Sequence, residues 1–266
     1  MSDEHRMAQA AQFLLEEHRT HKSFGPIPAA CAARTLDEAY AVQEAFHALM
    51  AATHGPVAGY KIALTTSVMQ QMVGFHEPVS GAILAGTIQQ SPCTIRSTAY
   101  GRLGVECEIA VRLQADLPVT PVPYNRDHMT AAIGAVMVAF ELIDDRNADY
   151  TQFAPQILSI IADNAWNGGI VLGPPATDWR TMDLAVAHGT MVINDVVVGE
   201  GYGRDVMGHP LDALVWLANE LAKRGKSLSR GMVVMTGSIV ATKFVHPGDT
   251  VRFWVDGLGE VRLSVA

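Results

Sequence analysis

The sequence predicts an α+β fold built on a mixed or antiparallel β-sheet. Helical periodicity fills the first 55 residues, and short apolar runs separated by glycine, proline and polar turns follow it. Only one helical stretch interrupts these runs, so helices and strands do not alternate as they do in βαβ units. We therefore expect a helical segment over residues 1–55 and a strand-rich part over residues 56–266, folded together as one continuous domain.

The N-terminal segment is predicted to form two helices. Apolar residues recur at helical spacing in residues 7–15, with Glu and His between them. Thr35 and Glu38 form a capping-box pattern, which marks the start of a second helix. This helix should run to about residue 49 and end before Gly55.

Strands are predicted for most of the remaining chain. The first four apolar runs cover residues 57–64, 81–88, 103–113 and 136–143. Residues 184–198 should form two strands joined by a turn at Asn194 and Asp195. A helix is expected over residues 209–224, with proline in its first turn and glycine after its last residue. Residues 232–265 return to strands.

Charge and composition exclude several kinds of function. The chain has 19 Lys and Arg against 27 Asp and Glu, and it has no basic run, so we do not expect nucleic acid as a partner. The longest apolar run, residues 131–140, is too short to cross a membrane. The N-terminus lacks the features of a secretory signal, and three widely spaced cysteines fit no disulfide framework. A soluble cytoplasmic protein is expected.

Two glutamates interrupt an otherwise apolar strand. Strand geometry places Glu106 and Glu108 on one face, about 6–7 Å apart, with Cys107 and Ile109 on the opposite face. Two like charges at that spacing repel each other and resist losing their water. A divalent cation would resolve both problems, and carboxylate ligands favour Mg²⁺, Mn²⁺ or Ca²⁺ over zinc. The alternative is that this face of the strand is simply solvated.

A third glutamate favours the metal-binding interpretation. Glu141 interrupts the apolar run 136–143, and three glutamates in two apolar strands are typical of a carboxylate triad that binds a cation. Asp144 and Asp145 follow directly and are expected to cap the next turn.

Lys61 is an unexpected charge in the middle of another apolar strand. Its side chain could extend to solvent, which is the usual arrangement. If it points into a metal pocket instead, burial and a nearby cation would lower its pKa. It could then transfer protons near neutral pH, with the substrate as its polar partner.

Several segments resemble those of a known group of enzymes. They are G-Y-K-I-A-L-T (59–65), V-E-C-E-I-A (105–110), A-F-E-L-I-D-D-R (139–146), A-D-N (162–164) and G-D-T-V-R-F…G-L-G (248–259). In these segments and in their order, the chain resembles the 2-keto-4-pentenoate hydratase and 4-oxalocrotonate decarboxylase group, which is related to the fumarylacetoacetate hydrolase fold. The resemblance extends from about residue 35 to the C-terminus.

The resemblance implies a fold, a cofactor and roles for residues. It implies a central β-roll, formed by a catalytic domain over residues 56–266, with the N-terminal helices packed outside. It carries Glu106, Glu108 and Glu141 over as ligands of Mg²⁺ or Mn²⁺, and Lys61 as the acid–base residue. It also implies a homo-oligomer built from dimers, and allows a complex with a paired hydratase or decarboxylase.

The resemblance further implies a lyase of aromatic meta-cleavage pathways that acts on small 2-oxo or 2-hydroxydienoic acids. A hydratase that adds water to a 2-hydroxypenta-2,4-dienoate-type substrate is slightly favoured over a 4-oxalocrotonate-type decarboxylase. Two alternatives stay open. One is a hydrolase that cleaves C–C bonds in acylpyruvates and needs a His–Glu pair to activate water. The other is a non-catalytic relative that binds a metal and an oxo acid.

The substrate pocket is expected to differ from that of the group. We expect substrate contacts from Leu64, Glu77, Asp163, Asn164 and Trp166. Val79 stands where the group usually has an acidic residue suited to a second proton shuttle, and His76 or Glu77 would have to replace it.

Overall fold

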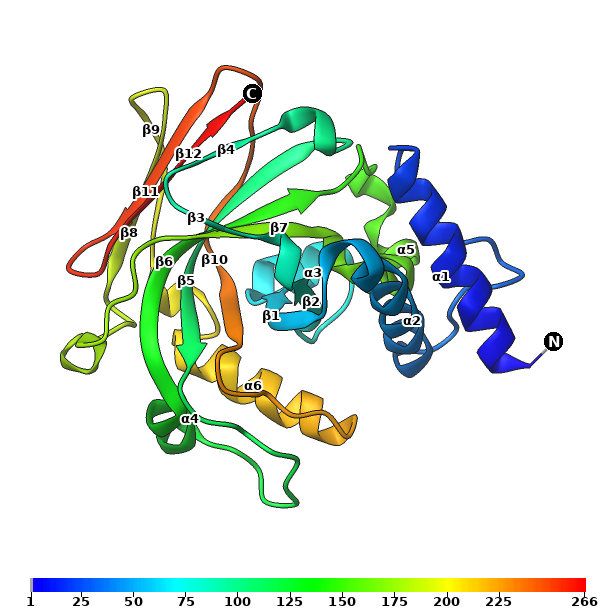
Figure 1. Cartoon of the computed structure of the whole chain (residues 1–266), viewed down its shortest axis with the longest axis horizontal. Helices are drawn as coiled ribbons and strands as arrows, with labels where there is room; N and C mark the ends of the chain where they lie inside the picture. The colour runs from blue at the N-terminus through cyan, green and yellow to red at the C-terminus, as the bar shows by residue number, and fades with distance from the viewer. Residues whose placement is uncertain (1) are drawn as a thin grey trace.

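The computed structural model describes residues 2–266 and contains two β-sheets with helices around them (Figure 1). The sheets occupy one side of the molecule, and the N-terminal helices occupy the other. The predicted α+β class, with a mixed sheet and helices packed outside it, is confirmed. In the described part of the chain, no helix is both long and apolar enough to span a lipid bilayer.

Two helices form the N-terminal part, α1 (Asp3–Arg19) and α2 (Leu36–His54). Thr35 caps α2 by accepting a hydrogen bond from the Glu38 amide at 3.2 Å. The Glu38 carboxylate binds the Arg34 amide instead of the Thr35 amide, so only half of the predicted capping box forms. The helix continues beyond residue 49 and ends at His54, before Gly55, which adopts a φ of +74°.

The larger sheet has seven strands in the order β2-β1-β10-β5-β6-β7-β3. These strands are β1 (Val57–Ala63), β2 (Val79–Leu84), β3 (Ile88–Gln90), β5 (Leu103–Leu113), β6 (Ile133–Asp144), β7 (Asn167–Leu172) and β10 (Val233–Phe244). Two of its strand pairs, β1–β10 and β3–β7, are parallel, and the others are antiparallel. The run 81–88, predicted as one strand, is divided between β2 and β3.

The smaller sheet has five strands in the order β4-β12-β11-β8-β9. They are β4 (Cys93–Ile95), β8 (His188–Ile193), β9 (Val196–Tyr202), β11 (Thr250–Val255) and β12 (Gly259–Val265). Asn194 and Asp195 turn the chain between β8 and β9 with positive φ angles, which confirms the predicted hairpin.

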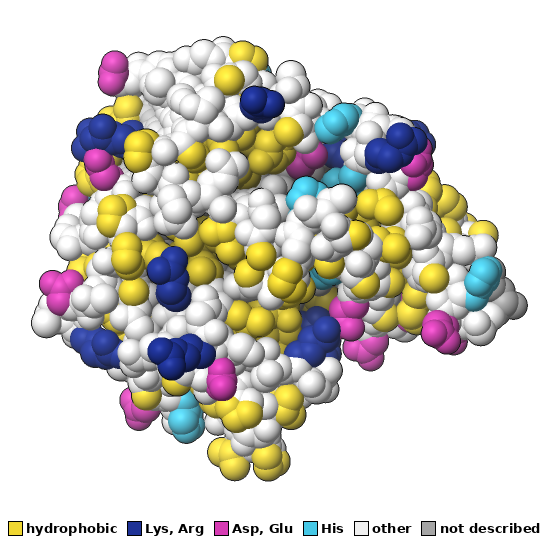
Figure 2. Space-filling model, in the orientation of Figure 1, with side chains coloured by type: hydrophobic (Ala, Val, Ile, Leu, Met, Phe, Trp, Pro, Cys, Tyr) yellow, Lys and Arg dark blue, Asp and Glu magenta, His cyan; other side chains and the backbone are white. Residues whose placement is uncertain are grey.

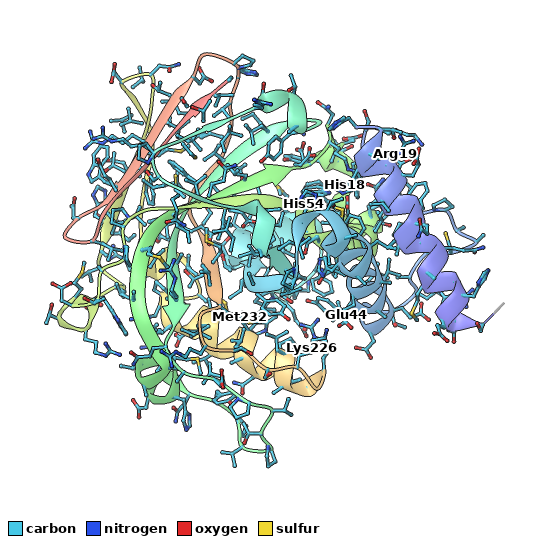
Figure 3. The ribbon with its side chains drawn as sticks, viewed as in Figure 1. His18, Arg19, Glu44, His54, Lys226 and Met232 are labelled. Atoms are coloured by element: carbon cyan, nitrogen blue, oxygen red, sulfur yellow. The ribbon has the colours of Figure 1, made fainter. Side chains whose placement is uncertain are left out.

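Four further helices complete the fold. They are α3 (Ser67–Val73), α4 (Arg126–Ala132), α5 (Phe153–Ala162) and α6 (Pro210–Lys223). The sequence predicted only α6 among them. Lys226, just beyond α6, forms an ion pair with Glu44 of α2 at 3.0 Å and so joins the two helices (Figure 3).

The two faces of the larger sheet have different surroundings. Residues such as Cys107 and Phe140 point outward and share a hydrophobic cluster with Phe253 of the smaller sheet. Their neighbours along the strands, such as Ala110 and Ala139, point to the opposite face, where a separate apolar cluster forms. We call this second side the inner face. A division of the chain into parts at residue 55 stays a prediction.

Candidate active site

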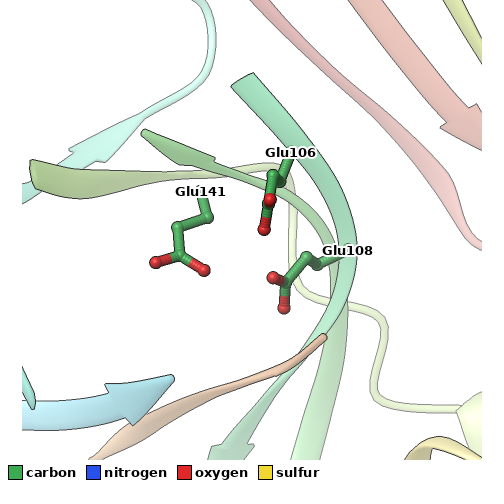
Figure 4. A group of neighbouring side chains, drawn as sticks. All are labelled: Glu106, Glu108 and Glu141. Atoms are coloured by element: carbon green, nitrogen blue, oxygen red, sulfur yellow. The ribbon is translucent and has the colours of Figure 1, made fainter. Parts of the chain in front are cut away.

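Three glutamates from two neighbouring strands converge on the inner face (Figure 4). Glu106 and Glu108 lie on β5, and the register between β5 and β6 places Glu141 directly opposite Glu106. One carboxylate oxygen of each lies within 4.8 Å of the other two. Glu108 and Glu141 are fully buried, and Glu106 is partly exposed. The structure therefore brings together the three residues that the sequence indicated, while their role as metal ligands stays a prediction.

Each carboxylate has one oxygen fixed by a neighbouring donor. The donors are the Thr242 hydroxyl to Glu106, the Gly237 amide to Glu108 at 2.7 Å, and the Asn167 side-chain amide to Glu141 at 2.8 Å. These bonds hold the carboxylates in defined orientations, as outer partners of metal ligands commonly do. Sequence reasoning assigned no such role to any of the three donors.

Two of the carboxylate oxygens are buried without a hydrogen-bond partner. They are Oε1 of Glu108 and Oε2 of Glu141. A buried, unpartnered carboxylate oxygen is costly, and the large majority of buried side-chain polar atoms have a hydrogen-bond partner. A divalent cation between the three side chains would satisfy both atoms. This donor set, made only of carboxylate oxygens, therefore fits Mg²⁺ or Mn²⁺.

The electrostatics of the cluster also favour a bound cation. Burial raises the pKa of Glu106, and repulsion from Glu141 raises it further. Burial and the same repulsion raise the pKa of Glu108 well above its ordinary value, although the Gly237 amide opposes this shift. A bound cation would reverse both shifts, because it stabilises the charged carboxylates.

Lys61 of β1 contacts this cluster. Its ammonium nitrogen lies 3.0 Å from Oε1 of Glu141, and its side chain is buried. Burial by itself would lower the pKa of Lys61, but Glu141, Glu106 and Glu108 outweigh it and hold this pKa above the ordinary value. The lowered pKa expected from sequence assumed a nearby cation. The three carboxylates raise it instead, and the first partner of the ammonium is Glu141 and not a substrate.

A glycine in β10 makes the contact with Glu108 possible. Gly237 has a φ of +118°, and a Cβ atom there would lie 2.6 Å from side-chain atoms of Thr65. The pairing of β10 with β5 shifts register beside this residue. A glycine inside an apolar strand often marks such an irregularity or a close approach, and this was the signal available in the sequence.

Comparison with known proteins identifies the family. Residues 57–266 match the family described as fumarylacetoacetate (FAA) hydrolase C-terminal. The chain belongs to this family. Within it, the chain is 29% identical to a 2-keto-4-pentenoate hydratase of Paraburkholderia phymatum, over 99% of each chain. It is 30% identical to a 4-oxalocrotonate decarboxylase of Pseudomonas putida, over 93% of this chain and 90% of the relative.

A solved structure extends the likeness to three dimensions. The 4-oxalocrotonate decarboxylase from Pseudomonas putida G7, complexed with magnesium and adipate, superposes with a TM-score of 0.90 at 28% identity. The match covers 100% of this chain and 99% of that protein. The resemblance derived from the sequence motifs is therefore confirmed.

The family resemblance had suggested Asp163 as a substrate contact, but this residue is occupied by protein partners. One carboxylate oxygen lies 2.5 Å from Nη2 of Arg146, and the other lies 2.6 Å from Nε2 of His18. Asp163 is fully buried, and these interactions join α1 to the end of α5. Substrate contact by Asp163 stays a prediction.

Asn164 and Trp166 lie in a left-handed turn, Asn164–Trp166, with φ angles of 56°, 44° and 61°. The Asn164 side chain accepts a hydrogen bond from the Ala82 amide at 2.7 Å and donates one to the Ala82 carbonyl at 2.9 Å. It also lies 2.8 Å from Nε2 of His47, whose pKa burial lowers to about 4. Asn164 therefore covers the open edge of β2.

Trp166 stacks near Tyr150, with ring centroids 6.2 Å apart.

A cavity of about 260 Å³ reaches this turn from the surface. Its lining includes His18 and His54, which Figure 3 labels beside the recess seen on this face in Figure 2. Asn164 and Asn167 also line it. Because Asn167 donates to Glu141, it contacts both this cavity and the carboxylate cluster.

The remaining predicted site residues lie at the ends of β1 and β2. Leu64 has a φ of 57° and packs, partly buried, against the cluster that contains Trp166. Val79 is buried among apolar side chains. His76 and Glu77 are exposed on the turn before β2, and their predicted roles remain predictions.

Proposed function

We propose that this chain is a divalent-metal-dependent lyase that acts on 2-oxo or 2-hydroxydienoic acids. A hydratase is the first candidate. The observation that carries the proposal is the cluster of three buried glutamates, with two unpartnered oxygens and a buried lysine 3.0 Å from one of them. The named relatives support it, because they are hydratases and a decarboxylase of this family. The magnesium in the similar structure supports the choice of cation.

Glu106, Glu108 and Glu141 would hold one Mg²⁺ or Mn²⁺. When bound, the ion would supply Lewis-acid stabilisation of the negative charge that develops on the 2-oxygen of the substrate. The Thr242, Gly237 and Asn167 donors keep the carboxylates oriented for this role. Glu108, Glu141 and Lys61 are buried, which strengthens the charge interactions between them.

Lys61 would act on the substrate through its Nζ atom. Its ammonium can donate a hydrogen bond to the substrate carboxylate or 2-oxygen and so fix the 2-oxo acid. It can also give a proton to the substrate and take one back while the 2-hydroxydiene becomes a ketone. Oε1 of Glu141 lies beside Nζ and stabilises the charged ammonium form of Lys61. In a hydratase, one water molecule then adds across the activated double bond.

A decarboxylase is the second candidate. The magnesium- and adipate-bound 4-oxalocrotonate decarboxylase matches the whole chain with a TM-score of 0.90, which supports this alternative. An apolar residue, Val79, also occupies the position of the expected second acid, and loss of CO₂ needs no residue that activates water. An acylpyruvate hydrolase would need a His–Glu pair, for which the exposed His76 and Glu77 are the sequence candidates.

Turnover of 2-hydroxypenta-2,4-dienoate, followed by loss of its ultraviolet absorbance, tests the proposal. We expect turnover with Mg²⁺ or Mn²⁺ and none after EDTA treatment. Product analysis then separates addition of water from release of CO₂ when 2-oxohex-3-enedioate is supplied. Neither reaction in the presence of bound metal would favour the non-catalytic alternative.

We also propose a homo-oligomer built from dimers, a complex with a paired hydratase or decarboxylase, and a cytoplasmic location. The support is the family and the high apolar content, 49% of residues, which allows surface to be used for interfaces. Light scattering should give a mass well above the 28.6 kDa of one chain. A monomer at micromolar concentration would contradict the oligomer.

A further inference from the structure

A second cavity, of about 240 Å³, lies between α2, the β2 edge of the larger sheet and the end of α6. We call it the α2–α6 cavity. Tyr60 of β1 and Ala82 of β2 line it from the sheet and pair with each other across the two strands. Tyr60 packs against the hydrophobic cluster outside the inner face. Because successive side chains of a strand point to opposite faces, Tyr60 faces away from Lys61, so this cavity is separate from the candidate active site.

The guanidinium of Arg224, which lines the α2–α6 cavity, is bound by neutral oxygens alone. Its Nη2 donates to the Ser80 hydroxyl at 3.1 Å, and its Nε donates to the Glu220 carbonyl at 3.4 Å. The Glu220 carboxylate pairs instead with Lys223 at 3.0 Å, and Arg224 forms no ion pair within residues 2–266. The buried Arg146, by contrast, is bound to a carboxylate at 2.5 Å. Arg224 is therefore a partly buried cation without a counter-charge.

The other charged groups of the cavity do not neutralise Arg224. Glu44 and Lys226, both labelled in Figure 3, line the cavity but form an ion pair with each other at 3.0 Å. Burial lowers the pKa of His47 to about 4, so this lining residue is uncharged at neutral pH. The cavity thus carries an excess of one positive charge in a chain whose net charge is −8. Such a local excess attracts an anion.

The rest of the lining is mostly apolar. Tyr60 contributes an aromatic ring, and the Gln43 amide is occupied by two main-chain carbonyls. The remaining residues are Ala48, Ala51, Val57, Ala82 and Leu221. An inorganic anion would leave these surfaces in contact with water, whereas an anion with a hydrocarbon body would bury them. Sites for drug-sized ligands span roughly 300–1,000 Å³, so the ligand of this smaller cavity must be small.

We propose that the α2–α6 cavity is a second ligand site, which binds a small organic carboxylate. The carboxylate accepts a charge-assisted hydrogen bond from Arg224, and the hydrocarbon body packs against Tyr60 and Leu221. The inference goes beyond the proposed function and does not rest on it, because none of these residues belongs to the glutamate cluster.

Calorimetric titration of the Mn²⁺-loaded full-length protein with benzoate tests the ligand class. Benzoate combines a carboxylate with a small flat hydrocarbon body, and it should bind saturably at one site. Benzamide has the same shape without the charge and should bind at least about tenfold more weakly. Phosphate has the charge without the body and should also bind more weakly. No saturable benzoate binding, or benzamide or phosphate binding as tight as that of benzoate, would overturn the inference.

Two substitutions locate the benzoate. Arg224→Gln removes the charge and should weaken benzoate binding about tenfold. Arg230→Gln, at an exposed arginine that does not line the cavity, is the matched control and should change nothing. Arg224 also stacks on Tyr40, with its guanidinium carbon 3.8 Å from the ring centre, so a thermal unfolding curve checks the fold of the variant.

The second substitution fills the cavity and leaves Arg224 in place. Ala48 is an exposed residue of α2 that lines the cavity, and leucine is a good helix former, so Ala48→Leu should fold and should abolish benzoate binding. Ala8→Leu, at an exposed position of α1, is its control. Unchanged benzoate affinity in Ala48→Leu, or in a folded Arg224→Gln protein, would overturn the assignment to this cavity.

Oxalate distinguishes this site from the metal site. It is a compact chelating dianion, so it should bind the Mn²⁺ ion and leave benzoate affinity unchanged. Displacement of benzoate by oxalate would place benzoate at the metal and overturn the inference. If oxalate fails to bind, the proposed function is contradicted, while the Arg224 and Ala48 variants still decide the inference.

Discussion

Nζ of Lys61 lies 3.0 Å from Oε1 of Glu141, and both side chains are buried on the inner face of the larger sheet. The same oxygen accepts a hydrogen bond from Asn167 at 2.8 Å. Glu141 therefore has one oxygen committed to protein partners and the other without any. This division would let one carboxylate contact both a lysine and a metal ion.

Replacement of Lys61 by methionine should remove turnover and spare the fold. Methionine keeps the length of the apolar stem but removes the charge at Nζ, so turnover should fall by roughly 10²–10⁴-fold, the usual contribution of a general acid–base group. Manganese affinity should be kept or should rise, because a positive charge beside the carboxylates is removed. Steady-state kinetics and calorimetry measure the two effects.

Lys226→Met is the matched control for this substitution. Lys226 is partly exposed and pairs with Glu44 on α2 (Figure 3), and it makes no ion pair with Glu106, Glu108 or Glu141 in the described residues. Its loss should leave turnover unchanged. A Lys61→Met protein that retained turnover within about threefold of the unmodified protein would contradict the acid–base role.

Replacement of Asn167 by alanine should weaken metal binding. Asn167 orients Glu141, and loss of such an outer partner typically lowers metal affinity by about 10–100-fold. Isothermal titration with Mn²⁺ measures this. Asn219→Ala is the control: Asn219 accepts a hydrogen bond from the Tyr124 amide and donates one to the Tyr124 carbonyl, and their loss should leave the affinity unchanged. Equal Mn²⁺ affinities for the two variants would argue against the orienting role.

Metal affinity should fall as the pH is lowered. Burial, together with repulsion from Glu141, holds the pKa values of Glu106 and Glu108 above their ordinary 4.5. Without metal, these two glutamates therefore keep their protons at pH values where a free glutamate has lost its proton. The cation must displace these protons when it binds. Affinity should be constant well above these raised pKa values and should decrease below them, by up to about tenfold per pH unit for each proton released.

Calorimetry in two buffers with different ionisation enthalpies measures this proton release. Measured between about pH 8 and pH 5.5, the number of protons released should grow as the pH falls. Glu108→Gln removes the group with the larger pKa shift and should make the pH dependence shallower. Manganese affinity that did not vary over this range would contradict the coupling.

Replacement of Asn164 by alanine should destabilise the fold. The variant loses two hydrogen bonds to Ala82 and one to His47, all buried, so we expect a loss of about 3 kcal/mol in the free energy of unfolding. Asn147→Ala is the control, because Asn147 also has a positive φ of 60° but bonds Gly101 at the surface. Urea unfolding should show a clearly smaller loss for the control.

The parts of the site that could be predicted from sequence are those that depend on strand periodicity. An alternation with a period of two fixes which face Glu106 and Glu108 share, and it placed Cys107 and Ile109 in the opposite core correctly. The apolar run around Glu141 likewise indicated a buried strand. These features are local, so no knowledge of the fold was needed.

The contacts between distant segments could not be predicted in this way. The pairing of Glu106 with Glu141 depends on the register between β5 and β6, which periodicity does not set across the intervening loop and α4. The donors Gly237 and Asn167 reach the carboxylates only after β10 and β7 take their places in the sheet. Family resemblance supplied the grouping that physical reasoning alone left open.

The missed helices have a related explanation. The α5 segment contains the run L-S-I-I-A, and a short apolar run does not distinguish a buried helix from a buried strand. The α3 segment is only seven residues long and includes two valines, so its helical signal is weak. The two helices pack against each other, and α5 also packs against α2.

The most direct test of the central claim is anomalous X-ray diffraction from crystals of the full-length protein grown with Mn²⁺ and oxalate. The account predicts one manganese peak among Glu106, Glu108 and Glu141, roughly 2.0–2.3 Å from one oxygen of each, with the oxalate bound to the ion and close to Nζ of Lys61. A manganese peak elsewhere, or an empty cluster at saturating Mn²⁺, would contradict it.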